Sequence, residues 1–552
     1  AALLDSDVRI SYEDLDTGCA QLAAVLRRQG VRPGDAVLIL VPLSIKFYLA
    51  VTAVLHLGAI PVLVDPGRGR SHVERCSKLV RPRAFIGSPL SHLLLISSAA
   101  LRQIPLRFST SAKIPGSHTL FGSLPTTGVG ITPVADDAPA LITFTSGSTG
   151  VPKAIVRSHG FLLAQHRVLQ YSLGHAGDEV VLSALPVFVL SHLAAGLTCV
   201  LPDCDLRRPG DIAPDRVIDQ LATHAVSAVE APPALLERIA RRCVEKEIRL
   251  AVRRFLVGGA PAFPRLMDEL ASVSPGCEVQ NIYGSSEAEP IAQISTSAVS
   301  PADICAMKNG RGLLVGRPVP SIGLRVLSQS WGARTRGSTS ELERASLPPG
   351  EVGEIVVCGD HVLSEYLDAQ QLTSKIHVSG VVWHRTGDVG YLDSSGRLWL
   401  LGRLETSSNA RGNLYPLSVE TAMSFCPDVQ RSAFFWFKGK RILALQLTSY
   451  RIDLRLVDEV LRRASVDSIW EVSHIPTDKR HNSKIDYSGL IGRRHREYKI
   501  REVNECAVSQ HTDDQATWIN LQTVKSPRLG SYAHLRQRVW QSLLNLVPRS
   551  LR

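Results

Sequence analysis

The chain has 552 residues, of which 44% are hydrophobic and 20% charged. These averages exclude a small disulfide-stapled domain, a disordered chain and a collagen-like repeat, and the length predicts two or more structural units. The formal net charge is +11, and residues 479–552 supply most of it, with 14 Lys and Arg against 6 Asp and Glu. Because this basic end carries no base-reading motif, we interpret it as a solvated surface and predict no nucleic-acid partner.

The ten cysteines are scattered without metal-ligand spacing, which predicts reduced thiols in a cytoplasmic protein. An uncharged run at 47–64 reaches the length of a membrane span, but a histidine, a glycine and a proline interrupt it. Together with the strand-like run at 36–41, this segment divides into strand, helix and strand. We therefore predict a buried βαβ unit here and no membrane span.

Residues 8–260 alternate short β-branched runs with stretches of helical period. Helices are predicted at 13–30 and 233–247, and strands at 36–41, 60–65, 84–88, 179–185, 227–231 and 253–260. This alternation is typical of the α/β class, with doubly wound parallel sheets that carry helices on both faces.

The pattern changes between 310 and 401 to short strands joined by turns, which predicts a β-barrel-like or hairpin subdomain. A Ser-Ser-Gly turn at 394–396 joins two of these strands, and Asp388 is placed at the end of another. A polar stretch without periodicity follows, and then a small α+β unit. The predicted organisation is an N-terminal domain, a hinge, a mobile C-terminal domain and a basic extension of unknown role, at 1–402, 403–412, 413–495 and 496–552. The extension contains one weakly amphipathic helix, predicted near 532–546.

The strongest local signal is LITFTSGSTGVPKAIVRSHG at 141–160. A strand-like run ends in a loop rich in glycine and hydroxyl groups, and Lys153 follows it. Glycines let backbone N–H groups turn toward an anion, hydroxyls add donors and the lysine adds a positive charge. The segment therefore predicts a polyphosphate-binding loop, although the Walker pattern does not fit it. The candidate loop residues are Thr145, Ser146, Gly147, Ser148, Thr149 and Gly150.

TSGSTGVPK resembles the phosphate-binding signature of the adenylate-forming superfamily, which includes acyl-CoA synthetases, peptide-synthetase adenylation domains and luciferases. Four further stretches resemble that family in the expected order: VGGAP at 257–261, YGSSEAEP at 283–290, WHRTGDVGYLDSSGRLWLLGR at 383–403 and RHNSKID at 480–486. The resemblance covers residues 8 to about 495 and implies a ligase that uses ATP and Mg²⁺.

The resemblance also implies roles for single residues. Glu287 is the metal ligand and a catalytic residue, since a carboxylate suits Mg²⁺. Asp388 and Arg403 bind the ribose. Lys484 is the catalytic lysine of the C-terminal domain and stabilises charge on the α-phosphate during attack. The remaining nucleotide-binding candidates are Gly259, Ala260, Tyr283, Gly284, Ser285 and Ser286.

Further segments resemble one branch, the β-lactone synthetases of olefin biosynthesis: VLVDPGRGR at 62–70, LPDCDLRRP at 201–209 and VGRPVP at 315–320. This branch implies that a long-chain 2-alkyl-3-hydroxy fatty acid is adenylated and that its own hydroxyl closes the ring. The tethered hydroxyl needs no second substrate. Partners would then be the small-molecule acid and other enzymes of the olefin pathway.

Two alternatives stay open. The protein could be a fatty acyl-CoA or acyl-carrier-protein ligase, which differs in needing a thiol. It could also be a catalytically silent scaffold that binds nucleotide or acyl chains. The presence of all four key residues argues against a scaffold: Lys153, Glu287, Asp388 and Lys484. His192 lies in the apolar run FVLSHLAAG. We interpret it as a core histidine, with a catalytic base as the alternative.

Overall fold

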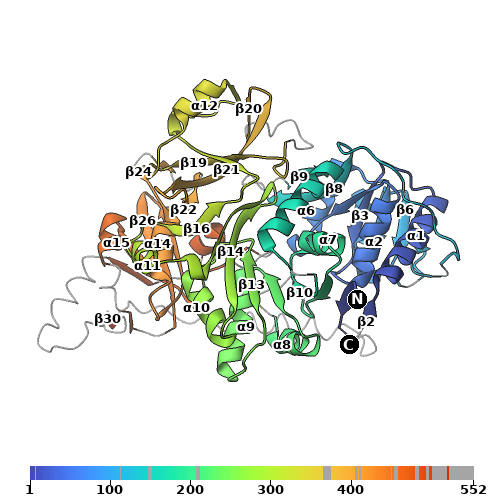
Figure 1. The fold of residues 1–552 in the computed structure, drawn as a ribbon, viewed down its shortest axis with the longest axis horizontal. Coiled ribbons are helices and arrows are strands. Elements are labelled where there is room, and N and C mark those ends of the chain that lie inside the picture. The colour runs from blue at the N-terminus through green and yellow to red at the C-terminus, as the bar shows by residue number, and fades with distance from the viewer. Residues whose placement is uncertain are drawn as a thin grey trace, which may run out of the picture.

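The computed structural model describes the chain up to residue 499 together with 519–520, except for 7, 112, 123, 147–151, 176, 207–211, 365–373, 405–407, 410–411, 449–450, 453–457, 479–483 and 493–495. Figure 1 shows the N-terminal sheet in blue and teal at one side, a green central sheet, and an orange unit after residue 413 at the other side. The helix predicted near 532–546 lies outside the described residues.

The first sheet has seven strands in the order β7-β6-β5-β3-β4-β8-β9. All are parallel except β9, which forms an antiparallel hairpin with β8. The strands are β3 (Ala36–Leu40), β4 (Ile60–Leu63), β5 (Ala84–Gly87), β6 (Leu106–Ser109), β7 (His118–Thr119), β8 (Pro139–Ser146) and β9 (Pro152–Ser158). The predicted βαβ unit is confirmed, because α2 (Ile45–His56) connects β3 with β4.

Alternation along β3 explains why helices cover both faces of this sheet. Val37 and Ile39 pack into one core cluster, whereas Leu38 and Leu40 pack into another. The helices of this region are α1 (Tyr12–Arg28), α2, α3 (Arg70–Val80), α4 (Pro89–Ser97) and α5 (Ala99–Arg102). No helix within the described residues is long and apolar enough to cross a membrane.

The second sheet begins with parallel strands, preceded by one antiparallel edge strand, in the order β2-β1-β11-β10-β12-β13-β14. These are β1 (Leu3–Asp5), β2 (Val8–Ile10), β10 (Val180–Ser183), β11 (Thr198–Leu201), β12 (Ala228–Ala231), β13 (Arg254–Gly258) and β14 (Glu278–Ser285). Val229 and Ala231 face a cluster with α8 (Pro214–Thr223), α9 (Pro233–Glu245) and α10 (Pro264–Val273). The opposite face packs against α6 (His159–Leu173) and α7 (Pro186–Ala194). The doubly wound α/β class is confirmed.

The strands after β14 are antiparallel, as predicted, and they continue the second sheet through β15-β16-β22-β21-β19-β17. They are β15 (Ala288–Ser295), β16 (Leu313–Pro318), β17 (Gly323–Leu327), β19 (Gly353–Cys358), β21 (Val381–Leu392) and β22 (Leu398–Arg403). Sequence patterns did not reveal this continuity, because β16 hydrogen-bonds to β15 across the helix α11 (Pro301–Lys308). Gly316 allows the approach: a Cβ there would lie 2.0 Å from the carbonyl oxygen of Gln293.

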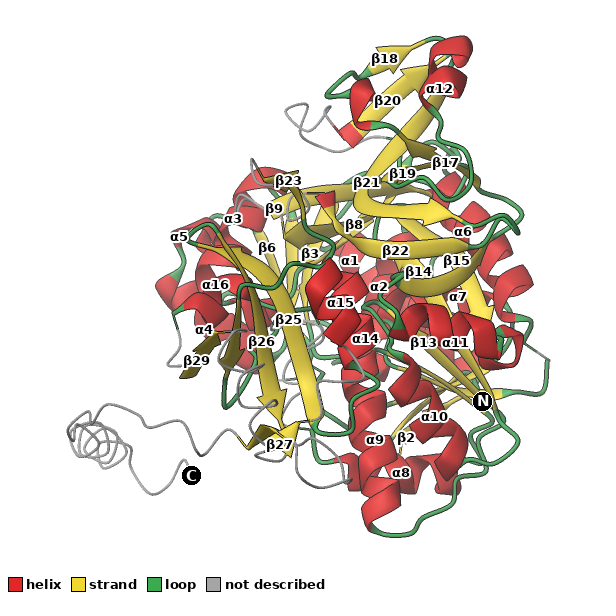
Figure 2. Cartoon of the chain, turned by 90° about the vertical axis from the view of Figure 1, so that its left-hand side faces the viewer, coloured by secondary structure: helices red, strands yellow, loops and turns green. Residues whose placement is uncertain are grey.

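Figure 2 shows β18 (Arg336–Gly337), β20 (Lys375–Val378) and α12 (Thr339–Ala345) projecting at one end of this sheet. The unit after residue 413 is a four-stranded sheet in the order β25-β26-β28-β29, with α14 (Pro416–Met423), α15 (Asp458–Arg463) and α16 (Tyr487–Ile491). Its strands are β25 (Val429–Phe437), β26 (Lys440–Leu447), β28 (Ser468–Glu471) and β29 (Arg496–Lys499). The strand β29 lies beyond the predicted boundary at 495, so the sheet is longer than the sequence pattern indicated.

The predicted hinge contains regular structure. β22 ends at Arg403, and the two-residue strands β23 (Ser408–Asn409) and β24 (Gly412–Asn413) pair with each other. A further short pair joins β27 (Arg451–Ile452) to β30 (Ile519–Asn520). Sequence periodicity cannot reveal strands of two residues. The division into domains itself stays a prediction.

Candidate active site

The predicted phosphate loop connects the two strands of the hairpin β8–β9. Thr145 and Lys153 lie directly opposite each other in this antiparallel pair. Lys153 is half-buried. The pairing fixes a hydroxyl and an ammonium on the two sides of the loop entrance. Gly147, Ser148, Thr149 and Gly150 lie outside the described residues, as does the side chain of Ser146.

Arg157, which sequence reasoning missed, joins this hairpin to a second predicted segment. Its side chain is buried and donates from Nη1 to the hydroxyl of Thr143 at 2.8 Å and from Nη2 to the carbonyl oxygen of Ser286 at 2.7 Å. One guanidinium therefore holds the strand of the phosphate loop against the YGSSE turn. The only signal in the sequence is a single arginine in the otherwise apolar run AIVRS.

Glu287 lies in the turn between β14 and β15, as the strand-turn pattern predicted. Its N–H donates to the hydroxyl of Ser285 at 3.3 Å, and its carbonyl oxygen accepts from the N–H of Leu363 at 2.7 Å. Gly284 lets the turn close, because a Cβ there would come within 3.0 Å of the Ala288 carbonyl oxygen. The backbone around the candidate metal carboxylate is thus fixed from two sides.

Two further residues near Glu287 were not predicted. Lys375 and His384 pair across β20 and β21, with Nζ and Nδ1 3.3 Å apart, and Lys375 also donates to the carbonyl oxygen of Leu363. Burial lowers the pKa of Lys375 to about 7, and the negative charge of Glu287 acts to raise it. Burial, followed by the charge of Lys375, lowers the pKa of His384. The buried amine of Lys375 therefore interacts electrostatically with the Glu287 carboxylate. His384 lies inside the quoted motif WHRTGD, whereas no sequence signal marks Lys375.

Asp388 lies inside the long strand β21, so its predicted place at a strand end is wrong. The strand continues because Gly387 adopts φ +70° and the pairing with β22 shifts register between Val389 and Gly390. The Asp388 carboxylate accepts from the hydroxyl of Tyr283 at 2.6 Å and from Nη1 of Arg403 at 2.9 Å.

These contacts bring three predicted residues together. Burial, followed by the charge of Asp388, raises the pKa of Tyr283 well above its usual value, so Tyr283 acts as a donor. Arg403 also donates to the carbonyl oxygen of Thr386 at 3.1 Å. Because each carboxylate oxygen has a second lone pair, Asp388 can still accept from hydroxyl groups of a ligand.

Gly259 and Ala260 follow the end of β13, and both are half-buried. Gly259 has φ +84°, a conformation that favours glycine. They lie at the carboxyl end of a parallel strand, which is where open α/β sheets bind ligands. The β13 strand pairs in register with β14, which carries Tyr283 and Gly284.

Lys484 belongs to the unit after residue 413 and is exposed. Its N–H donates to Oδ1 of Asp478 at 3.1 Å, and its carbonyl oxygen accepts from the N–H of Asp478 at 2.7 Å. The bridge between Thr477 and Ile485 continues this pairing. Lys484 therefore lies in the unit after residue 413, apart from the two large sheets that position the other predicted site residues.

The donor set around Glu287 fits a magnesium ion. Mg²⁺ prefers oxygen ligands and is usually held in proteins by one or two carboxylates together with phosphate oxygens and waters. Glu287 is a half-buried carboxylate in the turn that Arg157 connects to the hairpin β8–β9. The described residues thus provide a carboxylate for the metal ion in Glu287, an acceptor for hydroxyl groups in Asp388, and several positively charged side chains. This combination is suited to binding a nucleoside triphosphate.

Comparison with known proteins identifies the family of this chain. The sequence profile of AMP-binding enzymes matches residues 1–367. The chain belongs to the AMP-binding enzyme family. It is an AMP-forming ligase, and ATP is the nucleotide that this adenylate-forming family uses.

Among curated relatives of this AMP-binding enzyme, an olefin β-lactone synthetase of Stenotrophomonas maltophilia is 32% identical, and the match covers 87% of this chain and 90% of the relative. A protein of the same description from Xanthomonas campestris is 31% identical, with the same two coverages. The 4-coumarate–CoA ligase 1 of Narcissus pseudonarcissus is 23% identical over 77% of this chain and 76% of the relative.

Solved structures share the fold of this AMP-binding enzyme. The amide bond synthetase McbA of Marinactinospora thermotolerans matches with a TM-score of 0.73 at 22% identity, over 88% of this chain and 95% of that chain. The o-succinylbenzoate–CoA synthetase MenE of Bacillus subtilis, in complex with ATP and magnesium ion, matches with a TM-score of 0.68 at 21% identity, over 87% of this chain and 94% of that chain.

Proposed function

We propose that this ligase activates a long-chain 2-alkyl-3-hydroxy fatty acid with ATP and closes it to a β-lactone. In the first step a carboxylate oxygen of the acid attacks the α-phosphorus, and pyrophosphate leaves. In the second, the 3-hydroxyl oxygen of the acyl-adenylate attacks the carbonyl carbon, the bond to AMP breaks, and the hydroxyl proton is released to solvent. Ring closure is intramolecular, which replaces a second binding event with a high effective concentration. The two relatives described as olefin β-lactone synthetases support this choice of product.

Each site residue has a role in the proposed first step. Lys153 binds the phosphates that leave, and Asp388 accepts the ribose hydroxyls while Tyr283 and Arg403 hold it. Lys484 neutralises the charge that develops on the α-phosphate, a stabilisation that is stronger in the transition state than in the ground state. The unit after the hinge at 403–412 carries Lys484 to the nucleotide and moves as a body.

Glu287 would hold Mg²⁺, which supplies charge neutralisation for the phosphates when bound. The chain orients that carboxylate through Ser285 and Leu363. Lys375 and His384 are buried and contact each other, and the charge of Glu287 acts on Lys375.

The observation that carries the proposal is the contact of Arg157 with Ser286. It joins β9, the strand that follows the loop predicted to bind phosphate, to the turn that holds Glu287, although Arg157 and Ser286 are 129 residues apart in sequence. One buried guanidinium thus contacts the hairpin β8–β9 at Thr143 and the turn at Ser286, which supports a single nucleotide site formed by both segments.

Two measurements test the proposal. Exchange of labelled pyrophosphate into ATP, measured with 3-hydroxy and plain acids, reports acid activation. Mass spectrometry of the products in the absence of any thiol then reports ring closure. We expect lactone from 3-hydroxy acids and loss of pyrophosphate exchange in Lys484→Ala. A product that forms only after a thiol is added would instead establish the acyl-CoA or carrier-protein ligase. If none of the acids supported pyrophosphate exchange, the proposed activation of an acid would be contradicted.

A further inference from the structure

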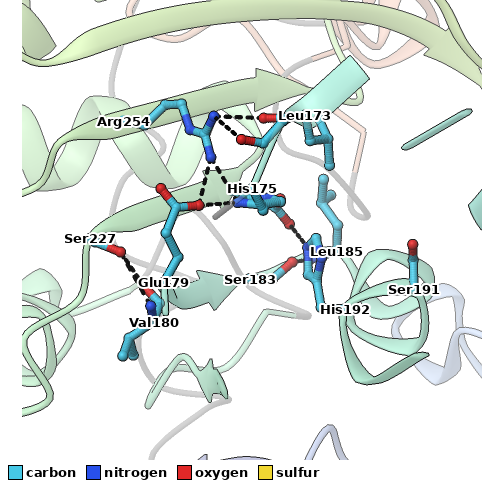
Figure 3. A network of polar contacts seen from close by, with 12 residues as sticks. Leu173, His175, Glu179, Val180, Ser183, Leu185, Ser191, His192, Ser227 and Arg254 are labelled. Atoms are coloured by element: carbon cyan, nitrogen blue, oxygen red, sulfur yellow. Dashed lines mark hydrogen bonds and ion pairs between the residues drawn. The ribbon is translucent and has the colours of Figure 1, made fainter. Parts of the chain in front are cut away.

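A buried polar network lies beneath the second sheet, outside the residues that the proposed mechanism uses (Figure 3). Glu230 of β12 is fully buried, and each of its carboxylate oxygens meets one imidazole. Nε2 of His175 lies 3.0 Å from Oε1, and Nε2 of His192 lies 2.7 Å from Oε2. Nδ1 of His175 in turn lies 2.6 Å from Glu179, which Arg254 also contacts at 2.7 Å.

Two polar groups share Nδ1 of His175. It lies 2.6 Å from Glu179 and 2.8 Å from Nη2 of Arg254, and the guanidinium can only donate. Burial acts to raise the pKa of Glu230, but the two imidazoles overcome it and lower this pKa to about 2. His175, His192 and Glu230 could together chelate a metal ion. Both oxygens of Glu230 and both ring nitrogens of His175 already have polar partners within the protein, however.

Two buried atoms of the network lack a hydrogen-bond partner among the described residues, Nε of Arg254 and Nδ1 of His192, and only the histidine can accept. Its Nε2 donates to Glu230, so in the neutral ring Nδ1 carries a bare lone pair. The side chain is 0% exposed, and Nδ1 has no hydrogen-bond partner among the described residues. Glu230 thereby fixes this tautomer. A buried acceptor without a donor favours a ligand that brings one, and a hydroxyl group is the simplest such donor.

Two side-chain contacts connect the helix of His192 with α6, and α6 with the strand that follows the turn of Glu287. Ser191, next to His192 on α7, contacts His166 of α6 at 2.9 Å. Gln165, the preceding residue of α6, donates to the carbonyl oxygen of Glu289 at 3.3 Å, two residues from Glu287.

Apolar side chains fill the space on the same face of the sheet. Leu256 lies opposite Glu230 in the pairing of β12 with β13, and it packs with Phe188 of α7 and Ile282, which precedes Tyr283. The buried polar network is therefore bordered by apolar side chains on this face of the sheet.

We propose that Nδ1 of His192 accepts the hydroxyl group of a hydroxylated acid substrate, so that this network selects hydroxy acids over plain acids. The inference rests on the proposed function, since it assumes that an acid is activated at the nucleotide site. Glu230 and His175 act as positioning residues that hold the acceptor lone pair toward the ligand. A site built to bond a hydroxyl rejects the analogue that lacks it, because the buried acceptor is then left unpaired.

Substrate discrimination by the unmodified enzyme is the first test. Pyrophosphate exchange is measured with a 3-hydroxy acid and with the plain acid of the same chain, and kcat/KM for the hydroxy acid is expected to be at least about tenfold higher. Equal values for the two acids would overturn the inference while leaving acid activation intact. Absence of exchange with every acid would instead overturn the proposed function.

The variant His192→Gln makes the test specific. Its side-chain amide nitrogen can replace Nε2 as the donor to Glu230, but it places no acceptor where Nδ1 stood. We expect kcat/KM for the hydroxy acid to fall about tenfold, with the plain acid unaffected. His166→Gln, at the neighbouring contact with Ser191, is the matched control and should keep the preference. An equal loss for both acids in His192→Gln, with an unchanged melting temperature, would contradict the assignment.

Discussion

The Asp388 carboxylate is fixed by two protein hydrogen bonds and can still accept hydrogen bonds from a ligand. Tyr283 occupies one carboxylate oxygen and Arg403 the other. The tyrosine is half-buried, whereas the arginine side chain is 58% exposed. The tyrosine bond therefore contributes more to holding the carboxylate, because exposed ion pairs are screened by water.

Replacing Tyr283 by phenylalanine removes that bond. We expect Tyr283→Phe to lose about 1.5–3 kcal/mol of unfolding free energy, the usual size of a hydrogen bond to a charged group, and to raise the KM for ATP. Urea unfolding and pyrophosphate exchange measure the two effects. Tyr391→Phe is the control, because that hydroxyl donates to a neutral carbonyl, Arg311 O, at 3.0 Å. Equal losses in both variants would contradict the role given to Asp388.

Lys375 makes stability depend on pH. Its pKa is about 7 in the folded protein and 10.5 in a solvated lysine, so between these values the unfolded chain binds more protons. Unfolding free energy therefore rises with pH across this window. We expect Lys375→Met to lose up to about 2–3 kcal/mol of the gain between pH 7 and pH 9, measured by urea unfolding. The exposed Lys308→Met should keep the wild-type gain, and a variant of Lys375 that also keeps it would refute the assignment.

Arg157 acts at the scale of elements, because it joins the hairpin β8–β9 to the turn between β14 and β15. Arg157→Lys cannot reach both acceptors and leaves one buried oxygen without a donor. We expect a loss of about 1–3 kcal/mol in unfolding free energy and a higher KM for ATP. Arg317→Lys is the control, since its contact with Ser395 lies at the surface. A variant of Arg157 with an unchanged KM would show that the two segments bind ATP independently.

Glu420 of α14 faces the core of the unit after residue 413. It accepts from the N–H of Phe434 at 3.0 Å and from the hydroxyl of Tyr487 at 3.3 Å. Burial raises the pKa of Glu420 to about 7, so the folded protein binds the extra proton between pH 4.5 and 7 and its stability falls as pH rises through that range.

Glu420→Gln keeps the acceptor without the charge. We expect this variant to be more stable than the wild type at pH 8 and similar to it at pH 5, measured by urea unfolding. The exposed Glu459→Gln should show no such dependence. A Glu420→Gln variant that is less stable at pH 8 would contradict the account.

Local patterns predicted the parallel βα elements well, because buried strands such as β3 and amphipathic helices such as α9 have strong periodicity. They also predicted Glu287 in its turn and Tyr283 beside Gly284. Lys375, Arg157 and the network around Glu230 could not be predicted, because a buried polar side chain has the same sequence signature as an exposed one. Only tertiary contacts, between residues up to 129 positions apart here, separate the two cases.

At the scale of the whole molecule, Asp388 lies in β21 and Lys484 in the unit after residue 413, so nucleotide binding and the chemical step should depend on different residues. We expect ATP with Mg²⁺ to raise the melting temperature of the wild type and of Lys484→Ala alike, since a ligand that binds the folded state stabilises it by mass action. Asp388→Ala should lose the increase. Thermal unfolding with and without ATP and Mg²⁺ measures this increase in melting temperature. A Lys484→Ala variant that ATP no longer stabilises would place this lysine in ground-state binding.

The direct bond between Tyr283 and Asp388 also reveals the shape of the second sheet. β14 and β21 are separated along that sheet by three strands, β15, β16 and β22, yet their side chains touch. Strands lie about 4.8 Å apart, so a flat sheet would keep the two residues well beyond reach of each other. The sheet must curl back on itself. Gly316 lies in β16, one of the strands between, where the register with β22 shifts and there is no room for a Cβ. The contact between Tyr283 and Asp388 therefore depends on the curl of this sheet. We expect substitution of Gly316 to lower the activity of the enzyme, although this glycine touches neither residue.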